Sequence, residues 1–169
     1  MSRARWTVVL VVAACLLVTI VAGPTLGFQF ARVEGQAMAP TLNNQDRLIV
    51  NRWAYTFSAP SRGDVVMLRY PGDRSKLFVK RVVAAGGDTV RIDDGRVFVN
   101  DVALDDAYVA EDGRSHETYG PQEIAAGHYF VLGDRRNNSS DSRHWGLVPE
   151  DDIVGRVAVR WYPSLDRPR

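Results

Sequence analysis

The sequence predicts a mostly β protein in which one transmembrane helix at the amino terminus precedes an all-β domain. Two observations support this class. No charged side chain occurs from Trp6 to Ala31, and the run from Val8 to Ala22 is almost entirely Val, Leu, Ile and Ala. Beyond this segment, short apolar runs alternate with polar residues and end at Gly, Pro, Asn or Asp, and none repeats with the 3.6-residue period of a helix.

The apolar segment is long enough to cross a membrane. As a helix, Trp6 to Phe28 would span roughly 34 Å at about 1.5 Å per residue, against a hydrocarbon core of about 30 Å. Arg3 and Arg5 precede it, and cationic residues favour the cytoplasmic side. We therefore predict a cytoplasmic amino terminus and membrane anchor over residues 1–28, an extracytoplasmic domain over residues 29–169, and a single-pass location in the cell membrane.

Two other interpretations of this segment are weaker. A cleaved secretory signal would have a shorter apolar core followed by a small-x-small cleavage site. Val21-Ala22-Gly23 matches such a site poorly. A lipid-attachment site at Cys15 is loosely matched, but Leu16–Ala22 continue the apolar run where an exposed terminus should become polar. The length of the run therefore favours a retained anchor.

The β domain is predicted from seven short runs. The Asp94-Gly95 pair between two of them is typical of a tight hairpin turn, and Gly86-Gly87 marks another strand end. Residues 101–126 are rich in Asp, Glu and Gly, and we interpret them as a connecting excursion without an assigned role. The predicted strands, in chain order, are Arg47–Arg52, Asp64–Tyr70, Leu77–Ala84, Thr89–Ile92, Arg96–Asn100, His128–Leu132 and Val154–Tyr162.

Composition excludes several kinds of site. Cys15 is the only cysteine and lies in the apolar segment, so the β domain has no disulfide and no thiol nucleophile. His116, His128 and His144 lack regular ligand spacing, and we predict neither a metal site nor a cofactor. Without Arg3 and Arg5, which precede the apolar segment, the chain has 19 basic residues and 20 acidic ones. This balance gives no reason to expect a nucleic-acid partner.

Lys80 is the strongest candidate for a catalytic residue. The chain has 19 arginines but only two lysines, Lys76 and Lys80. Strand alternation places Phe78, Lys80 and Val82 on one face. Apolar neighbours desolvate an amine and lower its pKa, so that it can accept a proton near pH 7, which an arginine cannot do. The competing interpretation is a lysine at a sheet edge that extends into water.

Three sequence motifs occur in order along the chain. Residues 33–42 read Val-Glu-Gly-Gln-Ala-Met-Ala-Pro-Thr-Leu and resemble the nucleophile box of type I signal peptidases, in which a serine directly precedes Met-x-Pro-Thr-Leu. Ala37 stands at the position of this serine. Residues 62–66 (Arg-Gly-Asp-Val-Val) lead to residues 80–83 (Lys-Arg-Val-Val), and residues 133–143 read Gly-Asp-Arg-Arg-Asn-Asn-Ser-Ser-Asp-Ser-Arg.

The resemblance implies a serine–lysine dyad. In the family, the serine that matches Ala37 is the nucleophile and the lysine that matches Lys80 is its general base. The serine that matches Ser139 hydrogen-bonds the lysine and orients it, while the aspartate and arginine that match Asp141 and Arg143 brace that loop. Such bracing is physically sensible, because a base must be held within about 3 Å of the proton that it takes.

The resemblance also implies two small apolar pockets for Ala-like side chains at positions −1 and −3 of the cleavage site. Shallow pockets walled by Met and Val would favour Ala by steric exclusion. Arg135, where the family usually has Asn, is a departure that we expect to lie away from the Ser139–Arg143 core. The matching pocket positions are Val33, Met38, Leu42, Phe78 and Val79, although core packing explains Leu42 and Val79 almost as well.

We therefore expect a membrane-anchored β domain of the signal-peptidase type that removes signal peptides from exported preproteins after an Ala-x-Ala-like site by acyl transfer. The expected partners are signal peptides of secreted preproteins and the lipid bilayer. Because Ala37 lacks the hydroxyl while the other catalytic positions remain, we expect an inactive variant, and the isolated change favours deliberate inactivation. The alternative is a natural non-catalytic homologue that binds signal peptides or partner proteins.

Two further alternatives fit the chain less well. A self-cleaving repressor of the DNA-damage response would carry a DNA-binding domain in place of the apolar segment. A lipoprotein adaptor would carry lipid on Cys15. The aromatic run Trp53-Ala54-Tyr55-Thr56-Phe57 leaves two interpretations open, namely ordinary core packing and a loop that enters the membrane interface.

Overall fold

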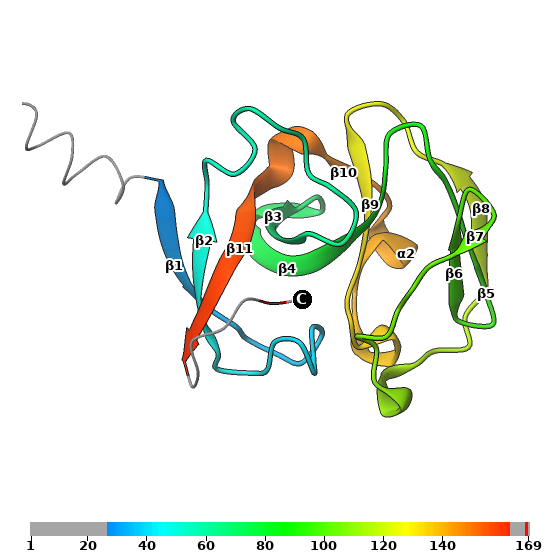
Figure 1. Ribbon diagram of the computed structural model, residues 1–169, viewed down its shortest axis with the longest axis horizontal. Coiled ribbons are helices and arrows are strands. Elements are labelled where there is room, and N and C mark those ends of the chain that lie inside the picture. Colours follow the sequence, from blue (N-terminus) through cyan, green and yellow to red (C-terminus); the bar gives the residue numbers. More distant parts are fainter. Residues whose placement is uncertain (1–26, 163–167, 169) are drawn as a thin grey trace, which may run out of the picture.

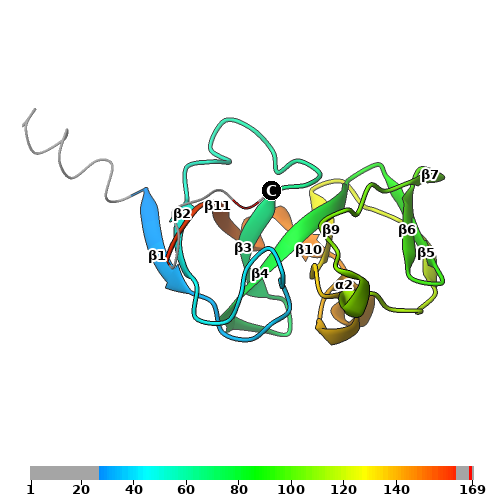
Figure 2. The same cartoon turned by 60° about the horizontal axis from the view of Figure 1, so that its bottom comes forward.

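The computed structural model describes residues 27–162 and residue 168, which form two antiparallel β-sheets. The larger sheet has the strand order β1-β2-β11-β3-β4-β9-β10, and the smaller sheet has the order β7-β6-β5-β8. In Figure 1 the smaller sheet lies at the end of the molecule beyond β9, and Figure 2 shows the same arrangement from a second direction. The predicted mostly β class is confirmed.

Short elements account for most of the described chain. The strands are β1 (Phe28–Arg32), β2 (Arg47–Asn51), β3 (Val65–Tyr70), β4 (Asp73–Ala85), β5 (Thr89–Asp93), β6 (Arg96–Val99), β7 (Val102–Ala103), β8 (Tyr119–Glu123), β9 (His128–Leu132), β10 (Val148–Pro149) and β11 (Ile153–Tyr162). The helices are α2 (Ser142–Trp145) and three 3-10 turns, η1 (Glu111–Gly113), η2 (Arg136–Asn138) and η3 (Glu150–Asp152).

The central strands of the larger sheet are apolar on both faces because both faces are covered. In β3, Val65 and Met67 belong to one buried cluster, while Val66 and Leu68 belong to another on the opposite side. A third cluster joins the ends of β4 and β9 to the smaller sheet. A strand that is buried on both sides has no polar face, which explains the continuous Val-Val-Met-Leu run.

Strand β4 has two different neighbours along its length. It pairs with β3 through the register from Tyr70↔Asp73 to Val65↔Arg81, and with β9 from Arg81↔Leu132 to Ala85↔Tyr129. Before Arg81, no strand of the described residues pairs with its other edge. The residues on this open edge therefore keep free backbone groups beside the candidate site.

The structure agrees with the seven predicted strands and adds four others, β1, β7, β8 and β10. The Asp94-Gly95 turn is confirmed, because Asp93 pairs directly with Arg96 and both turn residues have positive φ. The excursion over residues 101–126 contains β7, η1 and β8, so part of it belongs to the smaller sheet.

Most of the predicted membrane anchor lies outside the described residues. Phe28, the last residue assigned to the predicted helix, is instead the first residue of β1. In the part of the chain that the structure describes, no helix combines the length and apolar character needed to cross a membrane.

Candidate active site

Lys80 lies in the middle of β4 with only 4% of its surface exposed. Its Nζ donates a hydrogen bond to Ser139 Oγ at 3.1 Å and lies 5.6 Å from the centroid of the Phe78 ring. The predicted apolar face is present, since Phe78 and Val82 pack in the same cluster. The alternative of a lysine that extends into solvent is therefore wrong.

Burial changes the acid–base behaviour of this amine. Loss of hydration, the largest cause, and the positive charge of Arg143 lower the pKa of Lys80 from 10.5 to about 8. The carboxylates of Asp141 and Asp134 oppose this shift. At a pKa of about 8, about a tenth of the amine is neutral at pH 7, so a proton acceptor is available under physiological conditions.

The loop after β9 holds Ser139 against the lysine. Asp141 is fully buried, and its carboxylate accepts hydrogen bonds from Gly133 N at 3.0 Å and from Arg143 Nε and Nη2 at 2.8 and 2.9 Å. These contacts keep the pKa of Asp141 below its usual range even though burial opposes them. Asp141 also caps α2 by accepting from Arg143 N. The structure thus brings together the predicted group Lys80, Ser139, Asp141 and Arg143.

Gly133 is the point at which two loops of the site converge. A Cβ placed there would lie 2.2 Å from Ser139 Oγ and 2.5 Å from the carbonyl oxygen of Ala37. That carbonyl also accepts a hydrogen bond from Arg135 N at 3.0 Å. Only glycine allows the segment around Ala37 and the Ser139 loop to approach the end of β9 this closely.

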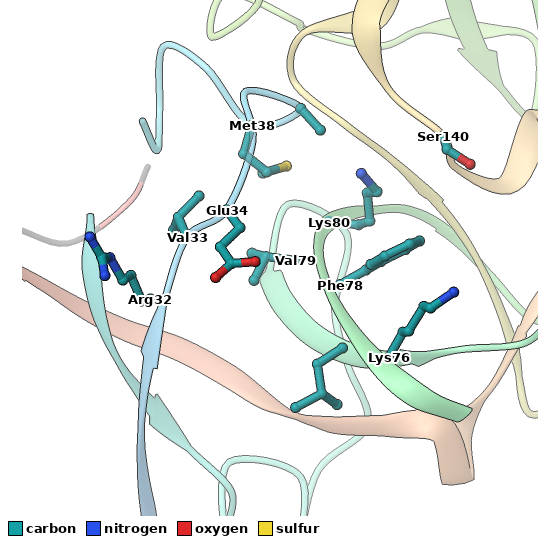
Figure 3. Close-up of a pocket in the computed structure, with 11 residues that line it drawn as sticks. Arg32, Val33, Glu34, Met38, Lys76, Phe78, Val79, Lys80 and Ser140 are labelled. Atoms are coloured by element: carbon teal, nitrogen blue, oxygen red, sulfur yellow. The ribbon is translucent and has the colours of Figure 1, made fainter. Parts of the chain in front are cut away.

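A cleft of about 590 Å³ opens beside the lysine. Figure 3 shows Val33 and Met38, which follow β1, on one side of the cleft, and Phe78 and Lys80 of β4 on the other. Ala37 and Val79 also line it. Leu42, by contrast, is completely buried in the core cluster that includes Val33 and Met38, and it does not line the cleft. Its predicted contact with a substrate therefore has no support in this geometry. Five further lining residues were not predicted: Arg32, Glu34, Lys76, Leu77 and Ser140.

Comparison with known proteins identifies the family. The model of the family described as signal peptidase, peptidase S26, matches residues 3–162. Signal peptidase I of Leptolyngbya laminosa is 38% identical over 139 residues, which cover 78% of this chain and 67% of that protein. The chain belongs to the signal peptidase S26 family.

Other members of the family agree with this assignment. Probable signal peptidase I-2 of Synechocystis is 40% identical over 137 residues, covering 78% of this chain and 62% of that protein. The chain thus spans about two thirds of the length of these two curated relatives. A crystal structure of a signal peptidase I from Enterococcus faecalis superimposes with a TM-score of 0.52 and 26% identity, covering 59% of this chain and 97% of that one. The signal-peptidase-type fold is therefore shown.

A second polar network, absent from the predicted site, joins the chain segments that line the cleft. Arg81 directly follows Lys80, and its Nε and Nη2 donate to the carboxylate of Asp134 at 2.8 and 2.7 Å. Thr41 Oγ1 donates to the same carboxylate at 2.6 Å. This buried network ties the segment that contains Ala37 to β4 and to the end of β9. The three residues lie within the family motifs, but their pairing is not visible in the sequence.

The side chain of Arg135, which was expected to lie away from the Ser139–Arg143 core, contacts the segment that contains Ala37. In addition to its backbone bond to Ala37, Arg135 donates from Nη1 to Gln36 Oε1 at 2.7 Å. The departure from the family pattern at this position therefore contacts the segment that contains Ala37. Among the described residues, no group of three His, Cys, Asp or Glu side chains could hold a metal ion.

Proposed function

We propose that this chain is a type I signal peptidase domain whose cleft receives the signal peptide of an exported preprotein, with Lys80 as general base. The observation that carries the proposal is the buried Lys80 amine, which donates to Ser139 and lines the same cleft as Ala37. A buried amine with its pKa near 8 suits proton transfer at neutral pH. Ser139 orients the amine, and Asp141 and Arg143 brace Ser139.

The reaction requires a hydroxyl at position 37. In a chain with serine there, Lys80 would take the hydroxyl proton while the serine oxygen attacks the carbonyl carbon of residue −1. The lysine would return the proton to the leaving amine. It would then take a proton from water as the water oxygen attacks the acyl ester, and give that proton to the serine oxygen as the ester bond breaks and the signal peptide leaves. Ala37 has no atom for the first step, so this chain should bind signal peptides without cleaving them.

The open edge of β4 supports binding of the substrate as an added strand. An extended peptide can form main-chain hydrogen bonds with an unpaired strand edge, while its alternate side chains enter pockets. Leu77 to Lys80 lie on this edge and line the cleft, and Val33 and Met38 face them. We propose that these apolar walls accept the small side chains at −1 and −3.

We also propose that the domain works at the outer face of the cell membrane, anchored by residues 1–28. Phe57 is 99% exposed and Trp53 is also largely exposed, which favours contact of these two residues with the membrane interface. Tyr55, in contrast, packs against the core, and its hydroxyl donates to Asp64 at 2.9 Å.

The decisive test restores the hydroxyl. Ala37→Ser should cleave a preprotein with an Ala-x-Ala site, and the parent chain should not. In this background, Lys80→Arg keeps the charge but cannot accept a proton, and it should lose at least about a thousandfold in rate. Lys76→Arg is the matched control: Lys76 lines the outer part of the cleft but pairs with Asp73 and not with Ser139, and arginine keeps its charge, so the rate should be nearly unchanged. Cleavage by the parent chain, or activity of Lys80→Arg within about tenfold of its parent, would contradict the mechanism.

Binding without cleavage is measured on the chain as it stands. Calorimetry should detect an Ala-x-Ala peptide, and replacing the −1 alanine by a bulky residue should weaken binding because Met38 and Val33 wall the pocket. Unchanged affinity for the bulky peptide would argue against these walls. Comparison of codon 37 with the genomic sequence distinguishes an engineered variant from a natural binding homologue.

A further inference from the structure

Residues 104–117, hereafter the 104–117 segment, pack against the loop that carries Ser139. The segment connects β7 to β8 and contains η1, which contacts η2. Asn137 in η2 donates from Nδ2 to the carbonyl of Asp112 at 2.7 Å. The segment therefore adjoins the lysine-orienting loop although it is distant from Lys80 in sequence.

Arg143 is the main link between this segment and the active site. Its side chain is only 4% exposed. On the active-site side, besides holding Asp141, its Nη2 donates to the carbonyls of Arg136 at 2.8 Å and Ser139 at 3.4 Å. The orientation of this guanidinium therefore determines the path of the chain that presents Ser139 to Lys80.

The 104–117 segment contacts Nη1, the remaining nitrogen of the Arg143 guanidinium. Nη1 of Arg143 donates to Ser115 Oγ at 3.3 Å and forms a close ion pair with the carboxylate of Glu117. A buried guanidinium whose three nitrogens all have acceptors cannot rotate without losing charge-assisted hydrogen bonds. Glu117 is half exposed, so its role is to fix the guanidinium and not to fill the core.

A second contact of the segment reaches the residue next to the lysine. The ring of Tyr108 lies under the guanidinium of Arg81, whose Cζ is 4.0 Å from the ring centroid. Arg81 follows Lys80 in β4 and is held by Asp134 on its other side. A planar guanidinium stacked on an aromatic face is restrained in orientation.

We propose that Glu117 and Tyr108 are positioning residues of the active site, which hold Arg143 and Arg81 and through them the Lys80 amine. This proposal rests on the proposed function, because it assigns to Lys80 the role of base. Neither residue touches the cleft, so their effect should appear in the acid–base behaviour of the lysine and in turnover, and not in substrate affinity.

The first test measures the titration of Lys80 by NMR in the Ala37 chain with isotope-labelled lysine. Only two lysines are present, and Lys76 serves as an internal reference. Removing the Glu117 anion leaves the positive charge of Arg143 less compensated, so Glu117→Gln should lower the Lys80 midpoint by about half a pH unit. Glu111→Gln, which alters an exposed carboxylate of the same segment that pairs with Arg114, is the matched control and should leave it unchanged.

The second test separates turnover from affinity in the Ala37→Ser background. Glu117→Ala and Tyr108→Leu should each lower kcat at least about tenfold with KM within about twofold, because a small displacement of a base is costly. Glu117→Asp and Tyr108→Phe, which keep the carboxylate and the ring, should recover most of the rate. Circular dichroism confirms that each variant is folded.

The outcomes distinguish the two proposals. If Ala37→Ser itself fails to cleave, the proposed function is wrong, while the titration of Lys80 in the Ala37 chain still tests the positioning role. If Glu117→Gln leaves the Lys80 midpoint unchanged and Tyr108→Leu keeps kcat within about twofold of its parent, the segment is only structural and the inference is overturned.

Discussion

At the scale of single residues, the proposed role of Lys80 as general base comes with a cost in stability. Its amine is buried against Phe78, and burial lowers its pKa from 10.5 to about 8. The unfolded chain therefore binds more protons than the folded chain between these two pH values. The free energy of unfolding should rise as pH increases from about 8 to about 10.5, and the full cost of the buried charge is present below about 8.

The same pKa predicts how the rate depends on pH. In the Ala37→Ser background, kcat/KM should increase about tenfold per pH unit below about 8 and level off above it, because the neutral amine is the active form. A pH–rate profile with an Ala-x-Ala peptide measures this. A profile that is flat between pH 6 and about 8 would exclude Lys80 as the base.

Removing the amine should stabilise the protein. Lys80→Met keeps the length and apolar stem of the side chain, and we expect it to raise the free energy of unfolding at pH 7 by about 2 kcal/mol, since the cost of the buried charge exceeds one hydrogen bond to Ser139. Denaturant unfolding measures the change. Lys76→Met is the control and should shift stability by less than about 0.5 kcal/mol. A less stable Lys80→Met would mean that the amine is net stabilising.

At the scale of elements, the active site depends on the convergence of the Ala37 segment, β4 and the loop after β9. Strand β4 and its apolar alternation were predictable from local pattern, and so was the Asp94-Gly95 hairpin. The strands that sequence reasoning missed lack such a pattern. β7 has two residues, β8 contains Gly120 and Pro121, and β1 is continuous with the preceding apolar run.

The contacts between these elements could be predicted only in part. The family motifs predicted that one site contains Lys80, Ser139, Asp141 and Arg143. No local pattern reports that Thr41 joins the Arg81–Asp134 pair. The packing of residues 104–117 against Arg143 could not be predicted either, because ion pairs between residues distant in sequence produce no periodic pattern.

Gly133 provides a test of this convergence. The added methyl group of Gly133→Ala would clash with Ser139 Oγ and with the Ala37 carbonyl, which is fixed by Arg135 N. We expect a loss of about 1–3 kcal/mol in unfolding free energy. At Gly113 the nearest atoms to an added Cβ are 3.6 Å away, so Gly113→Ala should change stability by less than about 1 kcal/mol. Equal stabilities of the two variants would show that the loops can separate at little cost.

At the scale of the whole molecule, the proposed anchor and the cleft define a topology. If residues 1–28 cross the membrane with Arg3 and Arg5 inside, protease added outside spheroplasts should digest residues 33–169 and spare the amino-terminal end. An epitope tag at each end, followed by immunoblotting, measures this. If the carboxy-terminal tag is fully protected in sealed spheroplasts and is digested only after the spheroplasts are lysed, the proposed orientation is wrong.

The unpaired edge of β4 before Arg81 also favours self-association of the protein. An open strand edge can pair with another copy of the same chain as readily as with a substrate, and such edges seed self-association. The stretch from Leu77 to Val79 is wholly apolar, and Lys76 with its partner Asp73 is the nearest exposed charged pair on the strand. Concentrated samples should therefore form β-paired oligomers through this edge, and a saturating Ala-x-Ala peptide should act as a solubilising agent by occupying it.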